Sequence, residues 1–247
     1  MFGRLSEETI QLAEKIIEVS PFNEGKVFFC NSGSEANDTT VKMLWMLNKR
    51  RGHPKKRKII TRINAYHGVT LGAASMTGKP YIEEFGMPLA DFIHADCPHY
   101  WKFALPEESE EDFSKRMAKN LEDLILKEDA DTIAGFFAEP VMGAGGVIPP
   151  SEGYFDLIQP ILKKYSIPFI ADEVICGFGR TGNLWGSDTY NLKPLGPKTI
   201  NCSGISYLTF QKHFMSSSYM NPYGEQTTTR TGGAVQNARM GTGKYGI

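Results

Sequence analysis

The sequence lacks several features that would assign a protein to a class at once. It has four cysteines in 247 residues and no C-x-x-C spacing, so neither a disulfide framework nor a zinc ribbon is expected. No apolar run approaches the length that crosses a bilayer, and the formal net charge of -1 leaves no excess of one sign. We therefore expect a cytoplasmic globular protein with reduced thiols and with neither nucleic acid nor a membrane as its partner.

Motifs for nucleotides, metals and export are also missing. No G-x-G-x-x-G follows an apolar run, and the glycine-rich segment 143–146 lacks the Lys-Ser/Thr of a P-loop. Residues 94–99 contain metal-ligating types, but no second cluster completes a tetrahedral site, so no metal is expected. Residues 1–20 carry glutamates and no apolar h-region, unlike a signal peptide.

Apolar runs alternate with helix-like segments over most of the chain. The strand-like runs are 27–30, 59–60, 133–138 and 168–171, and the segments with helical spacing are 7–19, 113–127 and 152–165. Continuous apolar strands between helices are typical of a mainly parallel sheet with helices on both faces. The sequence therefore predicts an α/β fold.

The pattern changes near Pro194. Residues 191–247 hold six basic residues and one acidic residue, are rich in Ser, Thr and Gly, and sustain no period. The stretch 224–247 has too little apolar content to offset the entropy lost on ordering. We expect residues 1–194 to form the α/β domain and residues 195–247 to form a divergent, poorly ordered tail.

The segment Asn31–Asp38 follows an apolar run and opens a predicted helix. Ser32 and Glu35 have the S-x-x-E spacing of a capping box, and Gly33 permits a sharp turn close to a ligand. Gly33 and Ser34 would present backbone N–H groups and a hydroxyl at a helix N-terminus, where orphan donors and the dipole favour a phosphate. A plain capped helix after a turn explains the same residues.

Asp172 and Glu173 follow the apolar run 168–171. Ligands of open α/β sheets bind at the carboxyl ends of strands, and charges there are costly without a task or a partner. Asp172 could accept a hydrogen bond from a protonated heterocyclic nitrogen, with Val174 packed on the ring. An N-cap or a salt bridge to Arg180 explains the carboxylates equally well.

Two other segments end apolar runs with polar or aromatic residues. Tyr66 and His67 follow the second run, where an aromatic side chain can stack on a planar cofactor or can simply pack the loop. Glu139 ends the run 133–138, at the sheet edge where we expect Asp172. The sequence therefore predicts a polar cluster at the strand ends.

Together these segments resemble the class III aminotransferases, which are fold type I enzymes that depend on pyridoxal 5'-phosphate (PLP). The resemblance covers most of residues 5–194 and is nearest to omega-amino acid, amine and 4-aminobutyrate transaminases that use pyruvate or a related oxo acid. The motifs stand in family order at Asn31–Asp38, Tyr66–Gly68, Ala138–Gly146 and Ala171–Gly182. The resemblance implies the large PLP-binding domain, with the small domain largely missing, and a homodimer in the intact family.

The resemblance also implies a cofactor site and small-molecule substrates, namely an amine and an oxo acid. The implied site residues are Ser32, Gly33 and Ser34 for the phosphate, Tyr66 and Val174 for the two ring faces, Asp172 for the ring nitrogen, and His67 and Glu139 behind the ring. The implied reaction is a ping-pong amino transfer in which a lysine holds PLP and moves the proton.

That lysine has no matching counterpart. In the family it lies roughly thirty residues beyond the aspartate, which falls near Asn201. Lys198 is the nearest candidate, but its neighbours do not match the family pattern. The likeness ends after Pro194, without the family's C-terminal domain and its substrate-binding arginine. We expect a truncated or frameshifted product that is inactive alone; a sister PLP activity, such as an aminomutase or racemase, is the alternative.

Overall fold

The computed structural model describes residues 6–20 and 25–193, together with the backbone of the short strands at 198–202, 205–209, 219–220 and 226–227. The chain divides into two compact units, one of residues 28–208 and one of residues 1–27 and 209–247, which are described separately. The expectation for residues 224–247 lies outside the described residues, apart from Gln226–Thr227. The predicted domain boundary at residue 194 stays a prediction.

The unit made of residues 1–27 and 209–247 contains one described helix. Helix α1 (Glu7–Val19) spans the residues for which the spacing predicts a helix, and Ser6 caps it by accepting from Thr9 N at 3.3 Å. Two short strands, β8 (Tyr219–Met220) and β9 (Gln226–Thr227), pair in antiparallel fashion. Strand β1 (Lys26–Phe28) crosses the boundary between the units.

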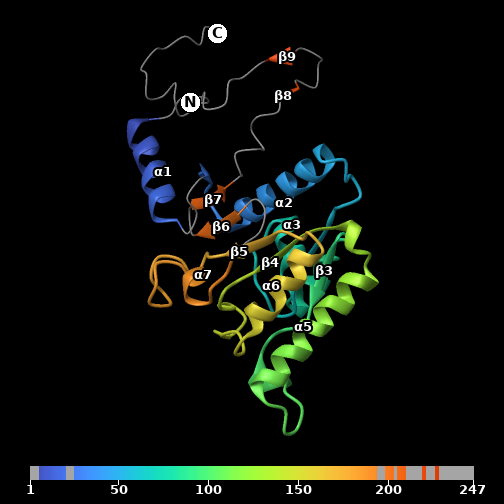
Figure 1. Ribbon diagram of the computed structural model, residues 1–247. Helices are drawn as coiled ribbons and strands as arrows, with labels where there is room; N and C mark the ends of the chain where they lie inside the picture. The colour runs from blue at the N-terminus through green and yellow to red at the C-terminus, as the bar shows by residue number, and fades with distance from the viewer. Residues whose placement is uncertain are drawn as a thin grey trace. The chain divides into compact units, whose positions relative to one another are not determined.

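A mainly parallel sheet forms the centre of the larger unit (Figure 1). In spatial order its strands are β7 (Ile205–Thr209), β6 (Lys198–Cys202), β5 (Phe169–Asp172), β4 (Ile133–Ala138), β2 (Lys58–Arg62) and β3 (Phe92–Ala95). The described pairings of β2 with β3, β2 with β4, β4 with β5 and β5 with β6 are all parallel. The predicted α/β fold is therefore confirmed.

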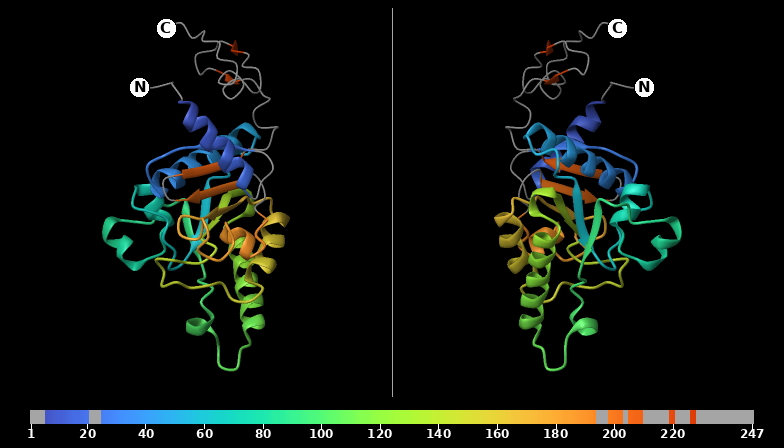
Figure 2. Two further views of the ribbon diagram at one scale, coloured as in Figure 1. Left: turned by 90° about the vertical axis from the view of Figure 1, so that its left-hand side faces the viewer. Right: turned by 90° about the vertical axis from the view of Figure 1, so that its right-hand side faces the viewer.

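Helices cover both faces of this sheet, as the two side views in Figure 2 show. The larger ones are α2 (Gly33–Arg50) and α3 (Leu71–Met76) on one face, and α5 (Glu110–Lys127) and α6 (Tyr154–Lys164) on the other. The shorter ones are α4 (Tyr100–Phe103), α7 (Gly186–Thr189) and the 3₁₀ turns η1 (Pro80–Phe85) and η2 (Ala130–Thr132). None of the helices in the described ranges is both long and apolar enough to span a bilayer.

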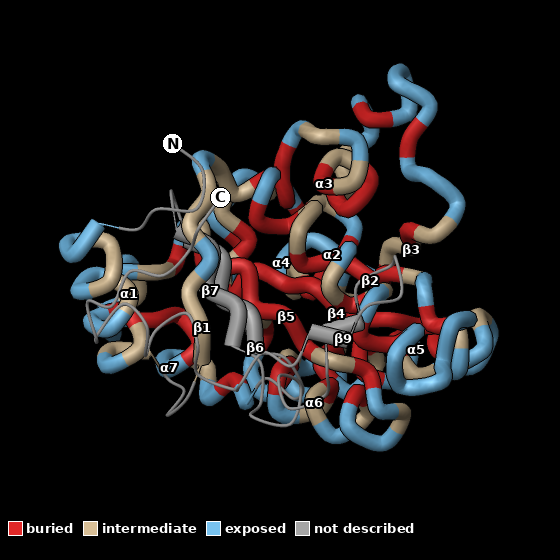
Figure 3. The backbone as a smooth tube through the Cα atoms, turned by 90° about the horizontal axis from the view of Figure 1, so that it is seen from above, coloured by how far each residue is buried: buried red, intermediate tan, exposed pale blue. Residues whose placement is uncertain are grey.

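The core lies on both sides of β4. Phe136 packs toward α5 and α6, whereas Phe137 packs toward α2 and α3. Every residue of β4 is buried, so the strand appears entirely as buried backbone in Figure 3. Because both faces are covered, the strand shows a continuous apolar run rather than the alternation of a half-exposed strand.

The parallel arrangement brings the sequence motifs to one edge of the sheet. Strand β4 is followed by Glu139. The neighbouring strand β5 ends at Asp172. The loop after β2 carries Tyr66 and His67 to the same edge. The polar cluster predicted at the strand ends is therefore present.

Candidate cofactor site

The N-terminus of α2 forms one side of the cluster. Ser32 is the N-cap, and its Oγ accepts from Glu35 N at 3.2 Å. Glu35 Oε2 accepts from Asn31 N at 2.7 Å, so the predicted capping box closes one residue before the cap. The N–H groups of Gly33 and Ser34 then lie in the first turn, where the helix offers donors and a partial positive charge to an anion.

Close packing at this helix end requires glycine. A Cβ at Gly33 would come within 2.9 Å of Val174 Cγ2, and one at Gly68 within 2.3 Å of Ser34 Oγ. Gly68 also has φ of +133°, which side chains rarely adopt. Ser34 Oγ accepts from Val69 N at 3.0 Å, which leaves its hydroxyl proton available to donate. Backbone donors, a hydroxyl and small residues together fit a phosphate group.

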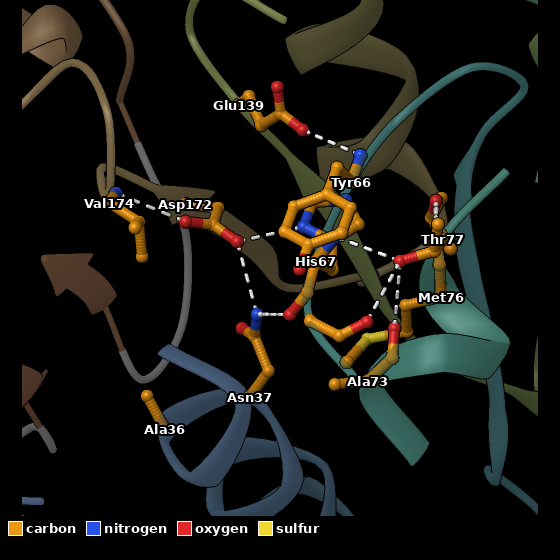
Figure 4. Close-up of polar contacts among 12 residues, drawn as sticks. Ala36, Asn37, Tyr66, His67, Ala73, Met76, Thr77, Glu139, Asp172 and Val174 are labelled. Carbon is orange, nitrogen blue, oxygen red and sulfur yellow. Dashed lines mark hydrogen bonds and ion pairs between the residues drawn. The ribbon is translucent and has the colours of Figure 1, made fainter. Parts of the chain in front are cut away.

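Asp172 forms the opposite side of the cluster and is 3% exposed. Its Oδ2 accepts from His67 Nδ1 at 2.8 Å and from Asn37 Nδ2 at 3.0 Å, and its Oδ1 accepts from Val174 N at 3.1 Å (Figure 4). A buried carboxylate is stable as an anion when donors converge on it in this way. Among the described residues these three hold it, in place of the salt bridge to Arg180.

Asn37 is a site residue that sequence reasoning missed. It is fully buried, and its Nδ2 also donates to His67 O at 2.7 Å. The available signal was its position one helical turn beyond Gly33, which places both residues on the same face of α2.

Glu139 joins the loop after β2 to the loop after β4. Its Oε1 accepts from Tyr66 N at 2.8 Å and its Oε2 from Gly143 N at 2.8 Å. Burial raises the pKa of the Glu139 carboxyl above its ordinary value, and the nearby charge of Asp172 adds to that effect while His67 opposes it. Tyr66, 37% exposed, keeps part of its side chain open to a ligand.

Glu173 has a structural role although it adjoins Asp172. Its fully buried carboxylate accepts from Gly186 N at 2.9 Å and from Ser187 N and Oγ, each at 2.6 Å. Burial raises the pKa of this carboxyl, and the three hydrogen bonds oppose that shift. These donors lie in the first turn of α7, whose N-cap is Trp185, so Glu173 satisfies the first N–H groups of that helix without being its N-cap residue.

Strand β6 lies beside β5 and contains Asn201, the position near which the resemblance places the covalent lysine. Its register places Asn201 opposite Asp172 and residue 200 opposite residue 171. Lys198 precedes Asn201 by three residues, or about 10 Å of strand, toward the other edge of the sheet. Only the backbone of this strand is described.

The sequence of most of the chain matches a known family of enzymes. The family described as aminotransferase class-III matches residues 2–195. The chain belongs to the class-III aminotransferases. Enzymes of this family use PLP, so the predicted cofactor is confirmed for the family, and the phosphate-shaped helix end and the buried carboxylate fit it.

Curated relatives of this aminotransferase chain include plant enzymes. It is 56% identical over 195 residues to gamma aminobutyrate transaminase 1, mitochondrial, of Solanum lycopersicum, and 54% identical over 195 residues to gamma-aminobutyrate transaminase 1, mitochondrial, of Oryza sativa subsp. indica. These matches cover 78% of the chain and 38% of each relative, so the chain spans well under half of their length. Since the relatives carry organellar names, the cytoplasmic location stays a prediction.

Solved aminotransferase structures share the fold. A PLP-bound aminotransferase mutant from Vibrio fluvialis superposes with a TM-score of 0.82 at 55% identity, covering 86% of this chain and 48% of that one. An omega-aminotransferase from Paracoccus denitrificans gives 0.80 at 58% identity, covering 85% and 48%. The large-domain fold is thus shown, while the role of each site residue stays a prediction.

Proposed function

We propose that this chain supplies the PLP-binding part of a transaminase that moves an amino group from an amine or omega-amino acid to an oxo acid such as pyruvate. The observation that carries the proposal is the convergence of a phosphate-shaped helix end and a buried, hydrogen-bonded Asp172 at one sheet edge. The names of the relatives, gamma-aminobutyrate and omega-transaminases, support the substrate class.

In this proposal Ser32, Gly33 and Ser34 bind the phosphate through the first turn of α2. Asp172 accepts a hydrogen bond from the ring nitrogen and keeps it protonated, because an ionised carboxylate beside it favours the charged ring. When bound, PLP supplies the electron sink that stabilises negative charge on the substrate carbon.

The remaining residues orient the ring. Val174, which already packs on Gly33, lies against one ring face, and Tyr66 lies against the other. His67 holds Asp172 from behind, and Glu139 holds the backbone of Tyr66 in place. The oxo acid and amine sites are not assigned to residues of this chain.

We further propose that the chain has no transaminase activity by itself. The register of β6 favours this, since Asn201 stands beside Asp172 and Lys198 lies toward the opposite edge. Without a lysine at the ring, the proton transfer between substrate carbon and cofactor has no base. The alternative of a sister PLP activity, an aminomutase or racemase, would need the same lysine.

Absorption spectroscopy and chemical trapping test both statements. The purified chain should bind PLP through Asp172 and the phosphate site, and borohydride treatment followed by peptide mapping should leave Lys198 unlabelled. Lys198→Ala should behave like the native chain. Stoichiometric labelling of Lys198, with pyruvate-dependent turnover of an amine that Lys198→Ala abolishes, would refute the inactivity. A chain that binds no PLP would refute the cofactor site.

A further inference from the structure

Asn37 joins parts of the site that lie far apart in the sequence. From the second turn of α2 its Nδ2 donates both to Asp172 Oδ2, 135 residues away, and to His67 O, 30 residues away. Figure 4 shows the amide between the carboxylate and the loop that carries His67. Both partner atoms can only accept hydrogen bonds, so this orientation of the amide is the one that the network requires.

The two donors on Oδ2 determine how Asp172 faces its ligand. Asn37 and His67 both bond to Oδ2, whereas Oδ1 accepts only from Val174 N among the described residues. A carboxylate oxygen accepts about two hydrogen bonds, so Oδ1 keeps capacity for a further donor. Because the amide is neutral, it fixes the rotation of the carboxylate without cancelling its charge.

We propose that Asn37 is a positioning residue that acts through Asp172 on the protonated ring nitrogen of the cofactor. It ties the phosphate-binding end of α2 to the carboxylate that holds the ring, so that both ends of the ligand are set by one helix. This inference rests on the proposed function, because it assumes that Asp172 pairs with that nitrogen.

The test compares two ligands on the full chain. One is pyridoxamine 5'-phosphate, which forms no covalent bond with lysine, and the other is its analogue with C–H in place of the ring nitrogen. The native chain should bind the first more tightly. Asn37→Ala should lower the affinity for pyridoxamine phosphate by about tenfold and the affinity for the carbon analogue by about twofold or less. Only pyridoxamine phosphate uses the oriented carboxylate.

A second variant guards against simple loss of folding. Asn37→Asp keeps the volume of the side chain, but its carboxyl can donate to Asp172 only while it is protonated, so the preference for the ring nitrogen should decrease as the pH rises and this carboxyl ionises. It should return in part at acidic pH, where the new carboxyl becomes protonated and can donate. A preference that stays absent at all pH values contradicts the proposal.

Asn48→Ala is the matched control. Asn48 lies on the same helix, is 6% exposed, and donates from Nδ2 to Lys56 O at 3.3 Å, away from the cluster. It should lose stability without changing the ligand preference. If Asn37→Ala weakens both ligands equally, or neither, the role of Asn37 is overturned while the cofactor site stands. If the native chain shows no preference for the ring nitrogen, both are overturned.

Discussion

Charged side chains are buried at one edge of the central sheet and more exposed to solvent at the other. At the carboxyl edge, Glu139, Asp172 and Glu173 are all buried, and each accepts two or more hydrogen bonds. At the amino edge, three ion pairs are within reach of solvent. These pairs are Arg57–Asp91, Lys58–Glu128 and Lys164–Glu122.

This difference in burial has an energetic meaning, because a buried charge and an exposed ion pair affect stability very differently. Burying a carboxylate without partners costs several kcal/mol, whereas an exposed ion pair contributes about 0–1 kcal/mol. Three buried acids at one edge therefore do not stabilise the fold by themselves, and each needs hydrogen-bond donors or a ligand. The donors on Glu173 come from a helix start, whereas those on Asp172 come from α2, from the loop after β2 and from Val174, which supports the proposal that Asp172 faces the ligand.

Removing the Asp172 carboxylate should have the largest effect on stability and ligand affinity. In Asp172→Ala the donors from Asn37, His67 and Val174 lose their acceptor, so the free energy of unfolding should fall by about 3 kcal/mol. The affinity for pyridoxamine phosphate should fall by about a hundredfold. Calorimetric titration measures the affinity, and urea unfolding measures the free energy of unfolding. Unchanged affinity would mean that this carboxylate does not face the ring.

Removing the neighbouring carboxylate should affect folding alone. Glu173→Ala leaves the N–H groups of Gly186 and Ser187 without their acceptor, and the free energy of unfolding should fall by about 2–3 kcal/mol. The ligand affinity of the folded fraction should change by about twofold or less. A loss of affinity as large as that of Asp172→Ala would contradict the structural role of Glu173.

The pH dependence of stability should differ between the edges. Burial raises the pKa of Glu139 above its ordinary 4.5, so the folded chain holds this proton more tightly than the unfolded chain. The resulting stabilisation is complete below pH 4.5 and is lost as the pH rises through the folded value. Glu139→Gln cannot ionise, so its stability relative to the native chain should improve from acidic to neutral pH. Urea unfolding across that range checks this, and parallel pH curves would contradict it.

A change at the amino edge should have the smallest effect. Arg57 donates from Nε to Asp91 Oδ2 at 3.1 Å and lies 4.1 Å over the Trp45 ring, with about half of its side chain exposed. Arg57→Ala should lower the free energy of unfolding by about 1 kcal/mol or less, and salt should reduce the difference. Ligand affinity should not change. A loss as large as that of Glu173→Ala would show that this pair is more than a solvated contact.

Elements with a strong local pattern could be predicted. The spacing in residues 7–19 predicts α1, and the run 133–138 predicts β4, because period and burial leave a direct trace in the sequence. Helix α3 and strand β3 were missed. They are six and four residues long, too short for a period to show, and β3 carries His94 among its apolar residues.

By itself the sequence determined the family, the cofactor and the order of the motifs along the chain. Caps, glycine turns and apolar runs are local, so their spacing survives in the sequence without knowledge of the fold. The resemblance already implied Asp172 rather than Glu173, but only the tertiary structure showed that the two adjacent carboxylates bond to different groups, because successive residues at a strand end point in opposite directions. It also brought Asn37 to Asp172, since a hydrogen bond across 135 residues depends on how the strands are ordered.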